Sequence, residues 1–463
     1  MNIAIIGAGL AGLTAAYELR RLTDAAGTEA AIAVFEADDR IGGKLHTVAF
    51  SDGPVDMGAE AFLARRKDMV EFVTELGLAN QLVHPSNLRP RVLTGGELHF
   101  LPAGGVMGIP GTPQDFFSAA TNARIENEQP FEWAVGSDVS VGALVRQQFG
   151  DEVADRVVSA LLGGVYSCLA DDLGLRATVP HLAEALDALV AEDPVTLGAA
   201  VRRVADGRTP AEGPIFATFT GGYAQLYEAL AERSGADIYL DTFVSGIART
   251  PEGFKVQGAP SDAPQLFDAV LLATPAPTAA RLLPKVAPEA SMALKQVKLA
   301  SSAVVGFRFD SATDPEGNSL PEATGILVAA DEPDMTAKAF TLSSNKWPHL
   351  GQRGGAYVRA SFGRFGDDAI VRAEEDDLVD IALDDLKRAT GFDGRAAGIS
   401  DIYTQRWFGG LPRYDETHLA TVAAARAAIA EVPGLEATGA WAGGVGVPNV
   451  VADARAAAAR LLA

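Results

Sequence analysis

The chain has 463 residues, too many for a single core, so two or three domains are expected. Its 60 acidic and 38 basic residues give a formal net charge of −22, which argues against nucleic acid or an anionic membrane as a bulk partner. The one cysteine, Cys168, excludes an intrachain disulfide and a thiolate metal cluster, and it fits a reducing compartment.

The N-terminal residues predict a strand, a glycine turn, a helix and a second strand. Gly7, Gly9 and Gly12 have the GxGxxG spacing between a β-branched run and an apolar helical pattern, and the second apolar run ends at Glu36. Such glycines allow a tight turn, a close approach to pyrophosphate and close packing of helix on strand, while the acid accepts ribose hydroxyl groups. The sequence therefore predicts a dinucleotide site at these residues: Gly7, Ala8, Gly9, Leu10, Ala11, Gly12, Glu36 and Ala37.

The next residues favour a flavin over a nicotinamide. An enzyme that binds a nicotinamide cofactor needs no second glycine and cation motif after Glu36. Here such a motif follows, with Arg40, Gly42, Gly43 and Lys44. Paired glycines would let a second loop approach the flavin, and a cation would offset phosphate charge. Taken alone, the two cations would be read as a solvated turn. Three small or polar residues precede an amphipathic helix, and we expect them to lie along the flavin ring: Gly58, Ala59 and Glu60.

Later segments return to the same domain. A strand reaching Val244 is expected after a glycine pair and a helix, and a glycine loop at 443–446 precedes the last helix. We therefore expect a mixed α/β protein with a discontinuous Rossmann-like nucleotide domain, a β-sheet substrate domain and a helical insert. The expected boundaries are 1–85, 215–280 and 432–463 for the nucleotide domain, 86–104 and 285–431 for the substrate domain, and 105–205 for the insert.

Together these motifs resemble the flavin superfamily that includes amine oxidases, phytoene desaturases and protoporphyrinogen oxidases. Three stretches are similar to the porphyrinogen oxidases: "RPRVLTGGELHFLPAG" at 89–104, the helical segment at 140–182, and "RWFGGLPRYDETHL" at 406–419. The resemblance covers nearly the whole chain. It departs at Cys168 and Leu169, in a loop that is usually more polar, and at Asp453, where many relatives have glycine.

The resemblance implies noncovalent FAD and oxidation of a porphyrinogen by molecular oxygen in haem biosynthesis. An acidic, alanine-rich chain without an anchor looks most like the bacterial coproporphyrinogen III oxidases, with protoporphyrinogen IX oxidases as the close alternative. Three hydride transfers to flavin N5, with hydrogen peroxide produced, would need no metal and no catalytic side chain. By matching motif, the resemblance places Arg91 at a substrate propionate and adds these FAD contacts: Val244, Trp407, Val445, Gly446 and Val447.

Two other classes share this fold. A flavin amine oxidase usually has an aromatic cage near the flavin, and none can be placed in this sequence. A nonenzymatic binder need not keep cofactor contacts, whereas every motif glycine and Glu36 are present here. Colourless purified protein that releases no flavin on denaturation would favour the binder.

Location and partners are constrained only broadly. The first predicted strand begins at Asn2, which leaves no room for a targeting segment, and no uncharged apolar run has transmembrane length. We expect a cytoplasmic protein that is at most peripheral to a membrane. The apolar loop at 107–117 could contact a membrane surface or a haem-pathway enzyme, or equally line the substrate channel. The sequence leaves the oligomeric state open.

Overall fold

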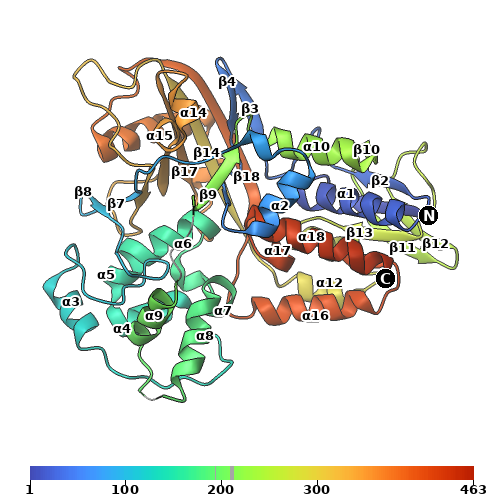
Figure 1. The fold of residues 1–463 in the computed structure, drawn as a ribbon, viewed down its shortest axis with the longest axis horizontal. Coiled ribbons are helices and arrows are strands. Elements are labelled where there is room, and N and C mark those ends of the chain that lie inside the picture. The colour runs from blue at the N-terminus through green and yellow to red at the C-terminus, as the bar shows by residue number, and fades with distance from the viewer. Residues whose placement is uncertain (193, 209–212) are drawn as a thin grey trace. The chain divides into compact units, whose positions relative to one another are not determined.

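The computed structural model describes residues 1–192, 194–208 and 213–463. It contains two compact units, each built from separate parts of the chain (Figure 1). Unit 1 comprises Met1–His84, Gly213–Lys298 and Ala420–Ala463, and unit 2 comprises Pro85–Glu212 and Leu299–Leu419.

Unit 1 is organised around a five-stranded parallel sheet. The strand order is β10-β2-β1-β13-β19, with Ile5 of the central strand paired to Val34 on one side and Leu271 on the other. Near-continuous apolar strands suit a sheet that is covered on both faces. The strands are β1 (Asn2–Ile6), β2 (Ala31–Phe35), β10 (Asp237–Tyr239), β13 (Ala269–Leu272) and β19 (Leu435–Ala437).

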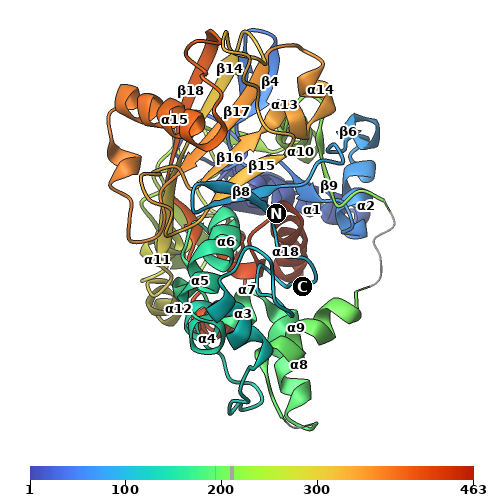
Figure 2. The same cartoon turned by 90° about the vertical axis from the view of Figure 1, so that its left-hand side faces the viewer.

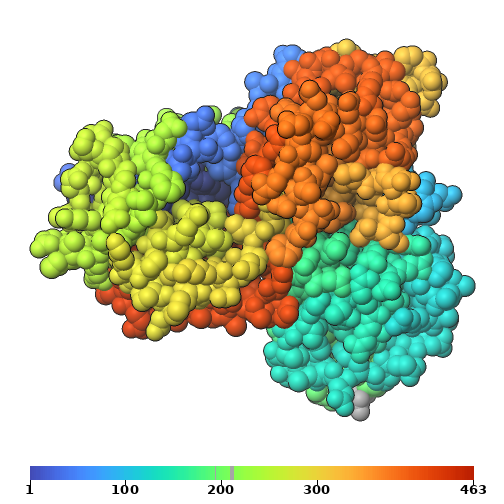
Figure 3. All heavy atoms as spheres, turned by 180° about the vertical axis from the view of Figure 1, so that it is seen from behind, coloured from blue at the N-terminus to red at the C-terminus, as the bar shows by residue number. Residues whose placement is uncertain are grey.

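Alternate residues of β1 enter two different cores. Ile3 and Ile5 pack with helices α1 (Leu10–Ala25), α10 (Ala224–Ser234) and α18 (Val447–Leu462), which lie side by side in Figure 1. Ala4 and Ile6 pack on the other face, against α11, α12 and α16. In Figure 3 the yellow atoms of the α11–α12 segment form part of the surface of unit 1. These helices are α11 (Ala276–Leu282), α12 (Pro288–Leu294) and α16 (His418–Ala430).

Smaller elements complete unit 1. Two antiparallel hairpins and a three-stranded sheet of order β5-β9-β6 accompany two short helices. Their bounds are β3 (Thr47–Phe50), β4 (Gly53–Asp56), β5 (Phe62–Leu63), α2 (Lys67–Glu75), β6 (Leu82–Val83), β9 (Phe216–Phe219), β11 (Gly246–Thr250), β12 (Gly253–Gln257) and α17 (Ala440–Gly443).

Unit 2 contains a seven-stranded mixed sheet, in which β15 and β7 form the one parallel pair (Figure 2). Helix α15 (Glu375–Thr390) covers one face, where Val305, Phe340 and Ala360 contribute to the shared core. The strands, in sheet order, are β18 (Ile399–Pro412), β14 (Leu299–Phe309), β17 (Ala356–Phe362), β16 (Ala339–Leu342), β15 (Gly325–Val328), β7 (Arg91–Thr94) and β8 (Glu97–Phe100).

The rest of unit 2 is mainly helical. Gly150 ends α4 with φ +94°, a conformation that glycine adopts without strain. Among the described residues, no helix has the length and hydropathy needed to cross a membrane. The helices are α3 (Ala119–Glu126), α4 (Val141–Phe149), α5 (Asp151–Val153), α6 (Ser159–Tyr166), α7 (Leu175–Thr178), α8 (Pro180–Leu189), α9 (Leu197–Asp206), α13 (Ser343–Lys346) and α14 (Pro348–Gly351).

The β-sheet expected in the second half of the chain is present in unit 2, where it includes β14, β15, β16, β17 and β18, but one detail differs from the sequence prediction. The strand expected to reach Val244 ends at Tyr239, because the backbone turns at Asp241, which has φ +49°. Unit 1 also includes residues 281–298, because Ala290 and Leu294 of α12 are buried in its core.

Candidate functional site

The glycine loop after β1 has no room for side chains at two of its three glycines. A Cβ at Gly12 would lie 1.8 Å from the carbonyl oxygen of Gly7, so α1 packs directly on the turn. Gly7 has φ +107°, and a Cβ there would lie 2.7 Å from the carbonyl oxygen of Ala273. The loop therefore presents bare backbone at the start of α1, which favours an anion.

The second glycine pair lies against the first loop. Gly42 donates its backbone N–H to Ala8 O over 2.9 Å, and Gly9 and Gly42 form an isolated parallel bridge. Gly43 has φ +57°, and a Cβ there would lie 2.9 Å from Gly9 Cα. Two sequence motifs thirty residues apart thus form one backbone surface, as a dinucleotide requires.

Glu36 is fastened to the same loop. Its Oε2 accepts the backbone N–H of Ala8 at 2.6 Å, and its Oε1 accepts the N–H of Asp38 at 3.0 Å. Ala37, the next residue, is exposed. The carboxylate therefore supports the loop in addition to the role expected at a ribose.

The two cations of the second motif are placed differently. Arg40 donates to backbone carbonyls of its own loop, including Gly43 O at 2.7 Å and Leu45 O at 3.3 Å, which stabilises the turn. Lys44 lies at an exposed position of the loop, and desolvation of its ammonium group by the surrounding protein lowers the pKa of that group to about 8. Lys44 is thus the cation of this pair that remains accessible to an anionic ligand.

The segment from Gly58 to Glu60 lies on the backbone of Lys44. A Cβ at Gly58 would lie 2.0 Å from Lys44 O, and Ala59 N–H donates to the same oxygen over 3.3 Å. Asp56, which sequence reasoning missed, holds this region: its buried carboxylate accepts the Thr47 hydroxyl at 2.5 Å and the Tyr223 N–H at 3.0 Å. Its one sequence signal is an acid at the end of an apolar strand.

The remaining expected contacts of unit 1 flank these loops. Val244 is buried. Two residues before it, Thr242 donates its backbone N–H to Glu36 O, which holds this segment beside Glu36. Gly446, with φ +98°, precedes α18, and no atom lies within 4 Å of a Cβ placed there.

Two residues that the sequence did not single out fix the loop from Val445 to Val447. Arg66 donates to Asn449 Oδ1 over 2.6 Å, and Asn449 Nδ2 donates to Val445 O over 3.0 Å. No local pattern indicates this pair, because its members lie 383 positions apart.

Asp453, at which the sequence was expected to depart from the family pattern, has a structural role. Its carboxylate accepts the Thr438 hydroxyl at 2.7 Å and pairs with Arg426. Gly443 makes space for it, since a Cβ there would lie 2.4 Å from the Asp453 Cβ. The aspartate is thus accommodated within unit 1.

In unit 2, Arg91 begins β7, and Gly95 and Gly96 form the turn to β8. The guanidinium lies over the Phe100 ring, 3.5 Å from its centroid, a cation–π contact. Because side chains alternate along a strand, Arg91 shares the face of Leu93, which packs in the core beneath α15.

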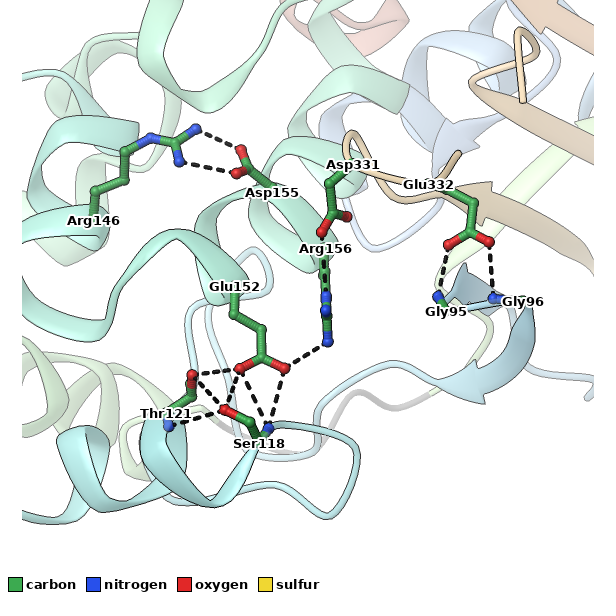
Figure 4. Close-up of polar contacts among 10 residues, drawn as sticks. All are labelled: Gly95, Gly96, Ser118, Thr121, Arg146, Glu152, Asp155, Arg156, Asp331 and Glu332. Carbon is green, nitrogen blue, oxygen red and sulfur yellow. Dashed lines mark hydrogen bonds and ion pairs between the residues drawn. The ribbon is translucent and has the colours of Figure 1, made fainter. Parts of the chain in front are cut away.

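A polar network fixes the turn of this hairpin (Figure 4). Glu332 accepts the N–H groups of Gly95 and Gly96 at 2.6 and 2.8 Å. Beside it, Asp331 pairs with Arg156 at 3.3 Å, and Arg156 pairs with Glu152 of the helical segment at 2.6 Å. The position of Arg91 is therefore tied to both parts of unit 2.

Two further residues complete the comparison with the sequence. Trp407 lies on β18, paired with Ser302 of β14, and belongs to unit 2 rather than unit 1. Cys168 is buried, and burial raises the pKa of its thiol to about 12, as suits a small core residue.

Residues 10–462 match the model of the flavin containing amine oxidoreductase family. The chain belongs to this family. The match confirms the resemblance found in the sequence, and it supports a flavin cofactor.

Individual relatives agree. A protein of Mycobacterium tuberculosis named coproporphyrinogen III oxidase is 39% identical over 98% of this chain and 95% of its own length. One of the same name from Bacillus subtilis is 29% identical over 98% of this chain and 97% of its own length.

Solved structures share the architecture. One from Exiguobacterium sp. 255-15, named provisionally as a protoporphyrinogen oxidase, has a TM-score of 0.84 and 26% identity, covering 99% of this chain and 98% of its own. The cyclohexylamine oxidase of Brevibacterium oxydans has a TM-score of 0.70 at 17% identity, covering 99% of this chain and 98% of its own, which shows the shared fold. The predicted mixed α/β flavoprotein class is confirmed.

Proposed function

We propose that the protein is an FAD-dependent oxidase that converts coproporphyrinogen III to coproporphyrin III in haem biosynthesis, with molecular oxygen as electron acceptor. The observation that carries this proposal is the 39% identity, over 98% of the chain, to a protein named coproporphyrinogen III oxidase. Flavin-linked oxidation also agrees with the family of the chain.

The residues of unit 1 fit an FAD molecule. The contact between Gly9 and Gly43 leaves backbone N–H groups without side chains over them, which suits a pyrophosphate. Lys44 supplies an accessible positive charge, and Glu36 remains the proposed ribose acceptor. We assign FAD to Gly7–Gly12, Glu36, Ala37, Arg40, Gly42–Lys44, Gly58–Glu60, Val244, Trp407 and Val445–Val447.

The chemistry requires little from side chains. Bound FAD supplies a two-electron acceptor, and three such oxidations remove the six electrons and six protons that separate a porphyrinogen from a porphyrin. Three molecules of oxygen would then give three of hydrogen peroxide. The protein has to hold the macrocycle and exclude water, so we assign no catalytic side chain.

We also propose that the chain segments bind cofactor and substrate as the sequence predicted. Residues 1–85, 215–280 and 432–463 would bind FAD, residues 86–104 and 285–431 would bind substrate, and residues 105–205 would form the helical insert. The glycine loops of unit 1 and the mixed sheet of unit 2 support this division. Arg91 is proposed to meet a propionate.

An aerobic assay on the FAD-loaded protein tests the proposal. Porphyrin fluorescence should appear faster per bound flavin with coproporphyrinogen III than with protoporphyrinogen IX under matched detergent conditions, with three hydrogen peroxide molecules per porphyrin. A preference for protoporphyrinogen IX would move the assignment to that substrate. Turnover of amines but not of porphyrinogens would identify an amine oxidase.

A further inference from the structure

Arg364, just after β17, is a half-buried cation without an acidic partner. Within the described residues, its Nε is buried and has no hydrogen-bond partner, and no carboxylate forms an ion pair with its guanidinium. Desolvation lowers the pKa of Arg364, an effect that the charge of Asp367 partly opposes. An arginine in this position carries a desolvation cost that an anion would offset.

Two other arginines of unit 2 form the ion pairs with carboxylates that Arg364 lacks among the described residues. Arg146, whose side chain is 29% exposed, contacts three carboxylates at 2.5 to 2.9 Å, and the one from Asp155 is drawn in Figure 4. Arg176 makes two hydrogen bonds to Asp187, at 2.7 and 2.9 Å. By contrast, Arg364 forms no ion pair with a carboxylate of the described residues, although the chain has 60 acidic residues.

The backbone around Arg364 is held in a fixed turn. Gly363 has φ +81°, and a Cβ there would lie 2.9 Å from Ser301 O, so only glycine fits. The next residue, Phe365, donates its N–H to Ser167 O over 2.7 Å. Ser167 itself has φ +53°, an uncommon conformation for a residue with a side chain. Strained backbone of this kind is concentrated at functional sites.

A buried lysine lies behind the turn. Lys338 is 6% exposed, and its Nζ donates to two neutral acceptors, Ser167 Oγ at 2.6 Å and Gly363 O at 2.7 Å. It therefore joins the two segments that position Arg364. A glycine of α6 lies close to the arginine, since a Cβ at Gly163 would lie 3.9 Å from Arg364 Nε.

We propose that Arg364 binds a carboxylate of the substrate and that Lys338 is a positioning residue that fixes the arginine turn. The inference rests on the proposed function, because coproporphyrinogen III carries four propionates. A guanidinium that forms no ion pair with a carboxylate of the described residues can bind one of them through two parallel hydrogen bonds. The bound propionate would supply the anion that the protein itself does not.

The test compares binding of coproporphyrin III with binding of its uncharged tetramethyl ester by fluorescence titration, in one detergent, on FAD-loaded protein. Arg364→Gln should weaken coproporphyrin III binding roughly tenfold to a hundredfold, the range for a hydrogen bond to a charged group, while ester binding stays the same. KM for coproporphyrinogen III should rise with little change in kcat. Arg364→Lys should recover part of the loss.

The matched control is Arg372→Gln, which removes an arginine whose side chain is 65% exposed and lies close in sequence. It should leave both dissociation constants and KM unchanged. If wild-type protein oxidises coproporphyrinogen III and Arg364→Gln alters neither binding nor KM, the inference is overturned while the proposed function stands.

Binding without oxidation is a separate outcome that can also be recognised. Arg364-dependent binding of coproporphyrin III, without oxidation of coproporphyrinogen III, would support the inference and refute the proposed activity. Absence of both binding and turnover in the folded, FAD-loaded wild type would refute both.

Discussion

Glu36 Oε2 accepts the backbone N–H of Ala8 over 2.6 Å, so the acid at the end of β2 is bonded to the glycine loop at the end of β1. The carboxylate is therefore a support for the loop as well as the proposed acceptor for ribose hydroxyl groups. Both roles depend on the same two oxygens, which makes this residue a sensitive probe of the cofactor site.

Glu36→Ala is expected to raise the dissociation constant of FAD roughly tenfold to a hundredfold, because hydrogen bonds to a charged group contribute about 1.5–3 kcal/mol. Flavin fluorescence on titration of apoprotein measures it, with circular dichroism to establish folding. Glu36→Gln keeps one carbonyl acceptor and should lose less. Equal FAD affinity in folded Glu36→Ala and wild type would remove Glu36 from the site.

The contact between the two glycine loops gives a second test. In Gly43→Ala, the new Cβ would lie 2.9 Å from Gly9 Cα and should push the loops apart, lowering FAD affinity at least about tenfold. Gly391→Ala is the control, since Gly391 also has a positive φ, +78°, but no atom within 4 Å of its Cβ position. Both variants carry the backbone strain, and only Gly43→Ala should lose flavin. Similar FAD content in the two would mean that the loop contact does not shape the site.

Arg91→Ala is expected to raise KM for coproporphyrinogen III, while FAD content and thermal stability stay close to wild type. Arg91→Lys should recover part of the loss, because lysine restores the positive charge but lacks the planar guanidinium that can bind a carboxylate through two hydrogen bonds. Steady-state kinetics at saturating oxygen measure both, with Arg372→Ala as a control that also removes an arginine lying over a phenylalanine ring. Unchanged kcat/KM in Arg91→Ala would leave the cation–π contact with Phe100 as its role.

The sequence predicted the parts of the fold that depend on local pattern. The GxGxxG spacing, the apolar strands and the acid at Glu36 specify a dinucleotide unit because each feature lies within a short stretch of chain. Likewise the hairpin after Arg91 follows from Gly95 and Gly96, whose positive φ angles suit a tight turn.

The long-range partners could not be predicted in the same way. The pair of Arg66 and Asn449 and the enclosure of Lys338 by Ser167 and Gly363 join segments that no local pattern relates. In the sequence, Lys338 is one more lysine beside a strand, and only tertiary packing makes it buried. The same holds for Arg364, because its lack of an ion pair with a carboxylate of the described residues depends on tertiary structure and not on a local pattern.

Burial of Lys338 predicts a specific dependence of stability on pH. Desolvation, with a smaller contribution from Arg364, lowers the pKa of Lys338 from 10.5 to about 7. Between these values the unfolded chain holds a proton that the folded chain lacks, so the free energy of unfolding should rise with pH, by about 1.4 kcal/mol per unit from this group. Below pH 7 the full penalty remains, and above 10.5 it is gone.

Lys338→Met removes this titration and adds an offset that does not depend on pH, since Gly363 O loses its donor. Urea unfolding, followed by tryptophan fluorescence at pH 7, 8 and 9, should therefore show wild type gaining stability relative to Lys338→Met at each step. Lys255→Met, which removes an exposed lysine, is measured alongside. A constant difference between wild type and Lys338→Met over this range would mean that Lys338 stays protonated in the folded protein, held by its two neutral acceptors.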